Sequence, residues 1–176
     1  MTLVLKPLVH AILEDYSLPW PGTHGVSHWA RVLENGLRLA KKTGAKVEVV
    51  QLFAVFHDSR RVNEGHDPGH GRRGAELAAA LRGDWFNLSD ADLDLLYEAC
   101  AGHTDGGTDG DTTVQTCWDA DRLDLGRVGT VPDPKRLCTT AARRLIRWAD
   151  GRACSEIVPE WVSEEWGIDV KGWLNR

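Results

Sequence analysis

The sequence predicts an all-α fold, and the spacing of its apolar residues carries this prediction. Apolar residues recur at intervals of three and four along most of the chain, which places them on one face of a helix. Alternation at every second residue, typical of half-buried strands, is almost missing. At 176 residues, the chain can bury a sizeable core and fits one domain better than two. We therefore expect a compact single-domain helical bundle formed by residues 1–176.

Start and stop residues place the expected helices along the chain. The first covers about residues 3–16 and is ended by the Leu-Pro-Trp-Pro-Gly segment that follows it. Thr23 is expected to cap the second, which runs to about residue 42. The third is apolar almost all round and should lie at the centre of the bundle. The third to seventh helices are expected at about residues 47–57, 71–81, 89–103, 112–125 and 135–149. A tail carrying Trp161, Trp166 and Trp173 is expected to lie across the bundle.

Composition argues against several classes of partner. The net charge of −5 comes from 21 basic and 26 acidic residues spread fairly evenly, which argues against a basic face for a long nucleic acid. No stretch approaches the roughly 18 apolar residues of a membrane span, and the N-terminus does not read as a signal peptide. The cysteines form no C-x-x-C pair, so we expect buried, reduced thiols in a cytoplasmic protein. They are Cys100, Cys117, Cys138 and Cys154.

Several predicted helices place a histidine or an aspartate on an otherwise apolar face. A buried carboxylate is costly unless it is paired or bound to a metal, although a lone inward histidine is more often a hydrogen-bonded core residue. Imidazole and carboxylate together suit a divalent first-row metal. The nearby Asp119 and Asp124 are instead expected on a solvated, salt-bridged helix surface. The inward side chains are His24, His28, His57, Asp58, His103 and Asp121.

The order of these residues resembles the HD superfamily of metal-dependent phosphohydrolases. Its signature is a histidine, an adjacent His-Asp pair and a distant aspartate, each on a different helix. The matching segments read HWARV, LFAVFHD and CWDADRLD and cover about residues 23–125. The resemblance implies one metal site formed by His28, His57, Asp58 and Asp121, with residues 135–176 packing on this core as a C-terminal helix and tail.

Two further segments are similar to members that bind two metals. They are HGRRGA, which begins at His70, and the His103-Thr104 pair. They imply a second metal held by His70 and His103 with Asp58 bridging, while His66 competes with His70 for this role. The expected cofactor is one or two divalent ions, without a choice among Mn, Fe, Co, Ni, Zn and Mg.

The activity that the resemblance implies is hydrolysis of a phosphate ester or anhydride of a small molecule, most plausibly a nucleotide. A metal-bound hydroxide would attack phosphorus beside Asp58, and His24 or His66 would protonate the leaving oxygen. Many family members carry glycine and lysine after the His-Asp pair, whereas this chain has Ser59-Arg60-Arg61. Arginine still suits phosphate, and Arg61 is a candidate beside Arg60, Arg72 and Arg73.

Two other functions use a similar scaffold. Some HD-fold proteins hold two irons and oxidise C–H or C–P bonds with dioxygen, and the six-ligand set His28, His57, Asp58, His70, His103 and Asp121 is compatible with that chemistry. A non-catalytic module that binds a nucleotide for regulation is the third candidate.

Overall fold

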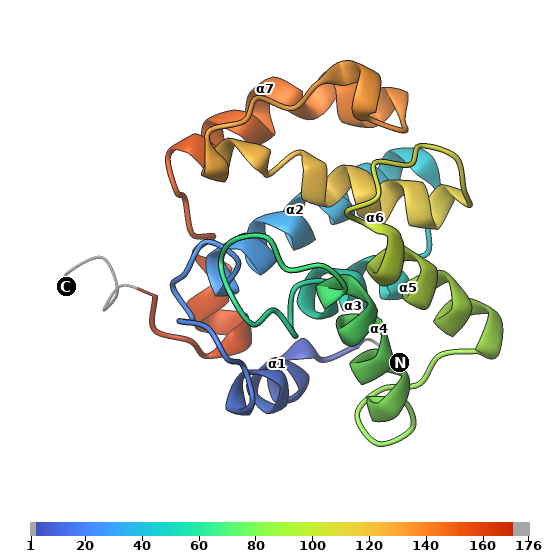
Figure 1. Ribbon diagram of the computed structural model, residues 1–176, viewed down its shortest axis with the longest axis vertical. Coiled ribbons are helices and arrows are strands. Elements are labelled where there is room, and N and C mark those ends of the chain that lie inside the picture. The colour runs from blue at the N-terminus through green and yellow to red at the C-terminus, as the bar shows by residue number, and fades with distance from the viewer. Residues whose placement is uncertain (1–2, 171–176) are drawn as a thin grey trace.

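The computed structural model describes residues 3–170, and within them the chain forms helices without a β-strand (Figure 1). A single isolated bridge joins Arg82 and Phe86. The predicted all-α fold is therefore confirmed. The α-helices are α1 (Leu5–Glu14), α2 (Val26–Thr43), α3 (Val47–Phe56), α4 (His70–Leu81), α5 (Asp90–Gly102), α6 (Thr112–Arg122) and α7 (Thr140–Cys154), and the shorter pieces are the 3-10 turns η1 (Leu125–Val128) and η2 (Pro134–Arg136) and the π-helical turn η3 (Val162–Trp166).

Helix α3 lies at the centre of the bundle, as its composition predicts. It packs against α2, α4, α5 and α6, and every residue from Leu52 to Phe56 is fully buried. In Figure 1, α7 lies on the outer side of α2 and α6, and α1 lies at the opposite side of the molecule. Because α3 ends inside this ring of helices, the side chains at its C-terminus face the interior rather than solvent.

Two predicted helix starts are wrong. Helix α2 begins at Val26 with Gly25 at its N-cap, because a tight turn bonds Val26 N to the carbonyl of Trp20. Thr23 therefore caps nothing, and His24 lies in the turn before the helix instead of one helical turn from His28. Helix α7 begins at Thr140, since the preceding 3-10 turn is a separate piece and Thr139 caps the helix through Ala142 N.

Asp119 explains where α7 starts. Its carboxylate is fully buried and accepts hydrogen bonds from Cys138 N at 2.7 Å and from Thr139 N and Oγ at 2.8 Å each. The expectation of a solvated Asp119 is wrong, because backbone N–H donors replace water around the charge. This carboxylate joins the end of α6 to the beginning of α7.

Close packing of α4 on the end of α3 depends on Gly74. A Cβ at this position would lie 2.2 Å from the carbonyl oxygen of Phe56. We expect Gly74→Ala to lower the free energy of unfolding by about 1–3 kcal/mol or more, because the two helices must separate. Urea unfolding measures this. Gly151→Ala in α7 is the matched control, since no atom lies within 4 Å of its added Cβ, and it should stabilise the protein by about 0.5–1 kcal/mol. Equal effects of the two changes would contradict the packing argument.

The four cysteines differ in their exposure to solvent. Cys100 and Cys117 are buried as expected, Cys138 is half-buried, and Cys154 is exposed, which corrects the prediction for that thiol. All four are unpaired.

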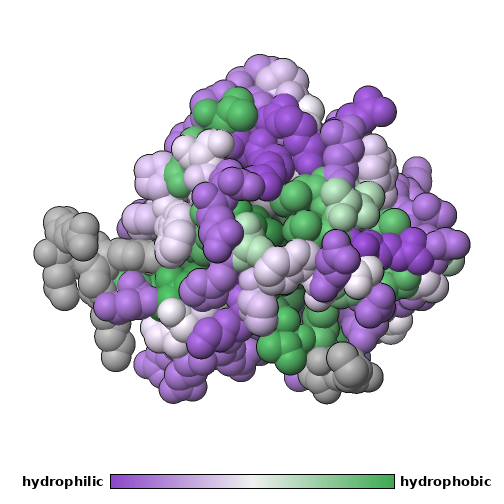
Figure 2. All heavy atoms as spheres, turned by 90° about the horizontal axis from the view of Figure 1, so that it is seen from below, coloured by the Kyte–Doolittle hydropathy of each residue, from purple (hydrophilic) through white to green (hydrophobic). Residues whose placement is uncertain are grey.

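No helix among the described residues is long and apolar enough to cross a membrane. Seen from the side of α1, the surface is mostly hydrophilic with smaller hydrophobic areas between (Figure 2). The predicted role of Trp173 lies outside the described residues.

Candidate metal centre

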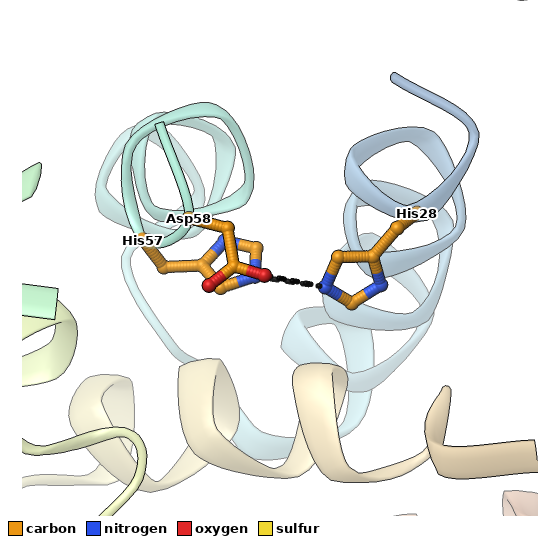
Figure 3. Close-up of side chains that lie close together, drawn as sticks. All are labelled: His28, His57 and Asp58. Carbon is orange, nitrogen blue, oxygen red and sulfur yellow. Dashed lines mark hydrogen bonds and ion pairs between the residues drawn. The ribbon is translucent and has the colours of Figure 1, made fainter. Parts of the chain in front are cut away.

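The structure brings together the four residues of the expected first metal site. His28 is in the first turn of α2, His57 and Asp58 follow the end of α3, and Asp121 is in the last turn of α6. His28 Nε2 lies 3.5 Å from Asp58 Oδ2 and 3.4 Å from Asp121 Oδ1. His57 Nε2 lies 3.7 and 3.8 Å from the same two oxygens. Figure 3 shows the His28 ring pointing from α2 toward Asp58 and His57.

A second group shares Asp58 with the first. Asp58 Oδ1 lies 3.0 Å from Nε2 of His70 and 3.6 Å from Nε2 of His103. His70 begins α4, His103 caps the end of α5, and both are buried. His66 is exposed and lines no part of this group, so the choice that the sequence leaves open falls on His70. The two groups, His28-His57-Asp58 and Asp58-His70-His103, each have the geometry to hold a metal ion.

The proton positions on the four imidazoles follow from their outer partners. Nδ1 of His28 bonds Asp124 Oδ2 at 2.7 Å, and the Nδ1 atoms of His57, His70 and His103 bond the carbonyl oxygens of Phe53, Asp67 and Cys100 at 3.1, 2.6 and 2.7 Å. These oxygens only accept, so each Nδ1 carries a proton, and a neutral ring has its lone pair on Nε2. Nε2 of His28 and His57 lie 3.0 Å apart, as do those of His70 and His103, and Arg61 Nη1 lies 3.1 Å from His70 Nε2. Each pair of rings thus turns two possible ligand nitrogens toward one another, as a shared metal ion would need.

One buried oxygen supports the same conclusion. Asp58 Oδ1 has no hydrogen-bond partner among the described residues, although burial makes an unsatisfied carboxylate oxygen costly. Carboxylate oxygens and imidazole nitrogens are ligands that divalent first-row metals accept. The residues therefore fit one or two such ions, with Asp58 placed to bridge them.

The electrostatics of the site keep its carboxylates ionised. Burial alone would raise the pKa of Asp58, but His57 and the other histidine side chains around it hold that pKa well below its usual range. The pKa of Asp121 is lowered in the same way, against burial, by His28 and His57. Burial lowers the pKa of His57 to about 3, so this ring stays neutral. The site thus combines two ionised carboxylates with a neutral imidazole, which suits a bound cation.

Asp124 is a functional residue that sequence reasoning missed. Expected on a solvated surface, it is buried with 1% of its area exposed. Its carboxylate accepts from His28 Nδ1 and from Arg31 Nε at 2.7 Å and Arg31 Nη2 at 3.1 Å. Such outer partners fix the orientation of a metal-ligating imidazole. No local pattern marks Asp124, because its partners are about 95 residues away in sequence.

A cavity of about 410 Å³ opens beside the two groups. Asp58, His70, His103 and Asp121 line it, together with His24, Arg61 and the segment of residues 125–137. Its size lies in the range of small-molecule sites. Three of the four arginine candidates point elsewhere, since Arg60, Arg72 and Arg73 pair with Asp15, Glu76 and Asp67. The sequence did not single out the other arginines that line the cavity, which are Arg122, Arg127 and Arg136.

His24 lies at the edge of this cavity in a fixed position. Tyr16 Oη and Trp29 Nε1 donate to its carbonyl oxygen at 2.9 and 2.8 Å. Its ring bonds Glu64 Oε2 through Nδ1 at 2.5 Å. Glu64 belongs to the segment between α3 and α4, which is held by internal hydrogen bonds such as Val62 N to Asp67 Oδ2 at 2.8 Å. The sequence offered no signal for Glu64.

The helical arrangement and the buried histidine–aspartate cluster define the class of fold. A crystal structure described as a predicted HD superfamily hydrolase, from an uncultured Thermotogales bacterium, superposes with a TM-score of 0.63. It shares 24% sequence identity, and the match covers 86% of each chain. The chain therefore has the HD-domain fold. No family model matches the sequence, and no curated protein matches it either.

Proposed function

We propose that the protein is a metal-dependent phosphohydrolase that cleaves a phosphate ester or anhydride of a small molecule, of the nucleotide class. The observation that carries this proposal is the pairing of two groups that could each hold a metal ion around one carboxylate, at a cavity that several arginines also line. A divalent ion bound there would lower the pKa of a coordinated water and offset negative charge on phosphoryl oxygens. His28, His57, Asp58 and Asp121 would hold the first ion, and His70 and His103 with Asp58 the second.

Arg61 is the side chain that we assign to the phosphate. Its Nη1 lies 3.6 Å from Asp58 Oδ1, so the guanidinium sits beside the bridging carboxylate. Nη2 donates to Gly65 O at 2.6 Å and Nε to Asn63 O at 3.3 Å, which fixes the planar group. A guanidinium held in this way offers a fixed positive charge to a phosphate oxygen. Arg127 and Arg136, which also line the cavity, would contact further anionic oxygens of the substrate.

His24 would donate a proton to the leaving oxygen. It lines the cavity without belonging to either metal group, and Glu64 orients its ring. We expect His24→Ala to lower kcat about a hundredfold while the metal content and KM change little, because proton transfer contributes about 10²–10⁴ to rate. Steady-state kinetics with metal analysis of the same sample measure this. His66→Ala is the matched control and should leave kcat unchanged, since His66 is exposed. A rise in KM alone in the His24 variant would contradict a proton-transfer role.

Phosphate release tests the proposed activity. The protein, stripped of metal and then reloaded with manganese, cobalt, nickel, iron, zinc or magnesium, is incubated with a panel of nucleotides and simple phosphate esters. We expect metal-dependent release of phosphate from at least one substrate, abolished by a chelator. Iron-dependent oxygen consumption without phosphate release would replace this proposal by oxygenase chemistry. Nucleotide binding without turnover for any metal would point to a regulatory module.

A further inference from the structure

Many of the basic residues are concentrated in two segments of the chain. Two segments, residues 35–47 and 135–149, contain nine of the 21 lysines and arginines and none of the 26 acidic residues. The rest of the chain is therefore strongly acidic. Charge asymmetry of this kind within one protein indicates an anionic partner. The expectation of evenly spread charges overlooked these two segments.

The fold places these two segments side by side. Arg38 of α2 lies over the ring of Trp148 of α7, with its Cζ 4.0 Å from the ring centroid. Glu34, one turn earlier in α2, pairs with Arg152, one turn later in α7, so the two helices run antiparallel here. Lys41 and Lys42 follow Arg38 by one turn, and Arg144 precedes Trp148 by one turn. These cations therefore lie at the same end of the α2–α7 pair.

The same set continues toward the cavity. Arg143 Nε donates to the carbonyl oxygen of Pro134 at 3.0 Å and Nη2 to that of Leu137 at 2.8 Å, which ties η2 to the start of α7. Arg136 of η2 also lines the cavity. We call the resulting exposed surface the basic face. It consists of Arg38, Lys41, Lys42, Lys135, Arg136, Arg143, Arg144 and Arg147, which are all exposed.

These cations differ from the other basic side chains in their pairing. Within residues 3–170, none of the eight has a carboxylate partner. By contrast, Arg31, Arg72 and Arg82 pair with Asp124, Glu76 and Asp90, and Lys46 pairs with Asp92. Unpaired like charges on one surface repel one another, and a polyanion removes that repulsion. In Figure 1, α7 lies at the outer side of the bundle, so a long ligand can approach it.

We propose that the basic face binds the phosphate backbone of a nucleic-acid strand. Arginine predominates over lysine in the set, and the planar guanidinium matches phosphate oxygens in a bidentate manner. The face also spans three elements, α2, α7 and η2, which suits a long charged chain better than a compact anion. This binding does not require the metal chemistry proposed for the cavity, although Arg136 belongs to both surfaces.

Fluorescence anisotropy with a fluorescein-labelled 20-nucleotide polyuridylate tests the proposal. We expect a dissociation constant in the range of about 10⁻⁴–10⁻⁶ M, weakening steeply as salt rises because counterions are released. The double variant Arg144→Glu/Arg147→Glu should weaken binding at least about tenfold and flatten the salt dependence. Both side chains are exposed and outside the cavity, so metal content and phosphate release should not change.

The control keeps the same change of net charge elsewhere on the molecule. Arg72→Glu/Arg82→Glu alters two arginines at α4 and its C-terminal cap, away from the basic face, and should leave polyuridylate binding within about twofold. Circular dichroism verifies that both double variants are folded. Absence of binding at low salt, or equal weakening by the two double variants, would overturn the proposal. Tighter binding of polyglutamate than of polyuridylate would assign the face to an acidic protein segment instead.

Discussion

Replacing Asp58 by alanine is expected to remove bound metal and to lower phosphate release by at least about a thousandfold. Among the residues that the structure describes, Asp58 is the one carboxylate shared by both groups, with Oδ2 toward His28 and His57 and Oδ1 toward His70 and His103. Its loss takes a ligand from each ion at once, and the Lewis acidity of such ions contributes several kcal/mol to catalysis. Elemental analysis and phosphate release on the same preparation measure both effects.

A second buried aspartate separates this effect from general damage to the fold. Asp119 lies two residues from Asp121 but bonds only Thr139 and the backbone at the start of α7. We expect Asp119→Asn to lower stability while the folded protein keeps its metal. Full activity of the Asp58→Ala protein, or equal metal loss in both variants, would contradict the assignment of Asp58.

Replacing Asp124 by alanine should lower the free energy of unfolding more than any other substitution considered above. Arg31, with 4% of its area exposed, would keep a buried charge without its carboxylate, and removing one partner of a buried ion pair costs about 3–5 kcal/mol. His28 would also lose the acceptor that orients its ring. The affinity for metal should therefore fall by about 10–100-fold. Urea unfolding of metal-free protein and metal titration of the folded fraction measure the two effects separately.

Glu34→Ala is the matched control for Asp124→Ala. It removes the carboxylate partner of Arg152 from α2, the helix that carries His28 and Arg31, but both side chains of this pair are about one-fifth exposed. The stability loss should stay below about 1 kcal/mol, and metal affinity should not change. An Asp124→Ala protein as stable as the Glu34→Ala protein would show that the buried carboxylate does not hold Arg31 and His28.

The fold was predictable because its evidence is local. The continuous apolar run of α3 fixed both its helical character and its central place, and Ser89 caps α5 through Asp92 N as its sequence indicates. The predicted starts of α2 and α7 were wrong because contacts beyond the adjacent residues determine where these helices begin. Trp20 O sets the beginning of α2 and Asp119 that of α7, and neither contact has a signature in neighbouring residues.

In the candidate site, the proposed ligands were predictable from the sequence, whereas their supporting partners were not. The residues that the family resemblance supplied come together in space, and burial decides between His70 and His66. Their supporting partners could not be found in this way. Asp124, Glu64 and Arg31 act on residues that are 40 to 96 positions away, so only the folded chain reveals them.

The central claim is that the two groups around Asp58 hold divalent metal, and the metal content of the protein tests it most directly. The protein is purified without chelator, and its metals are quantified per chain by elemental analysis before and after stripping and reloading. We predict one or two transition-metal ions per chain, lost on stripping, regained on reloading and absent from the Asp58→Ala variant. A folded protein that binds no metal at any loading would contradict the claim and assign the histidines and aspartates a structural role.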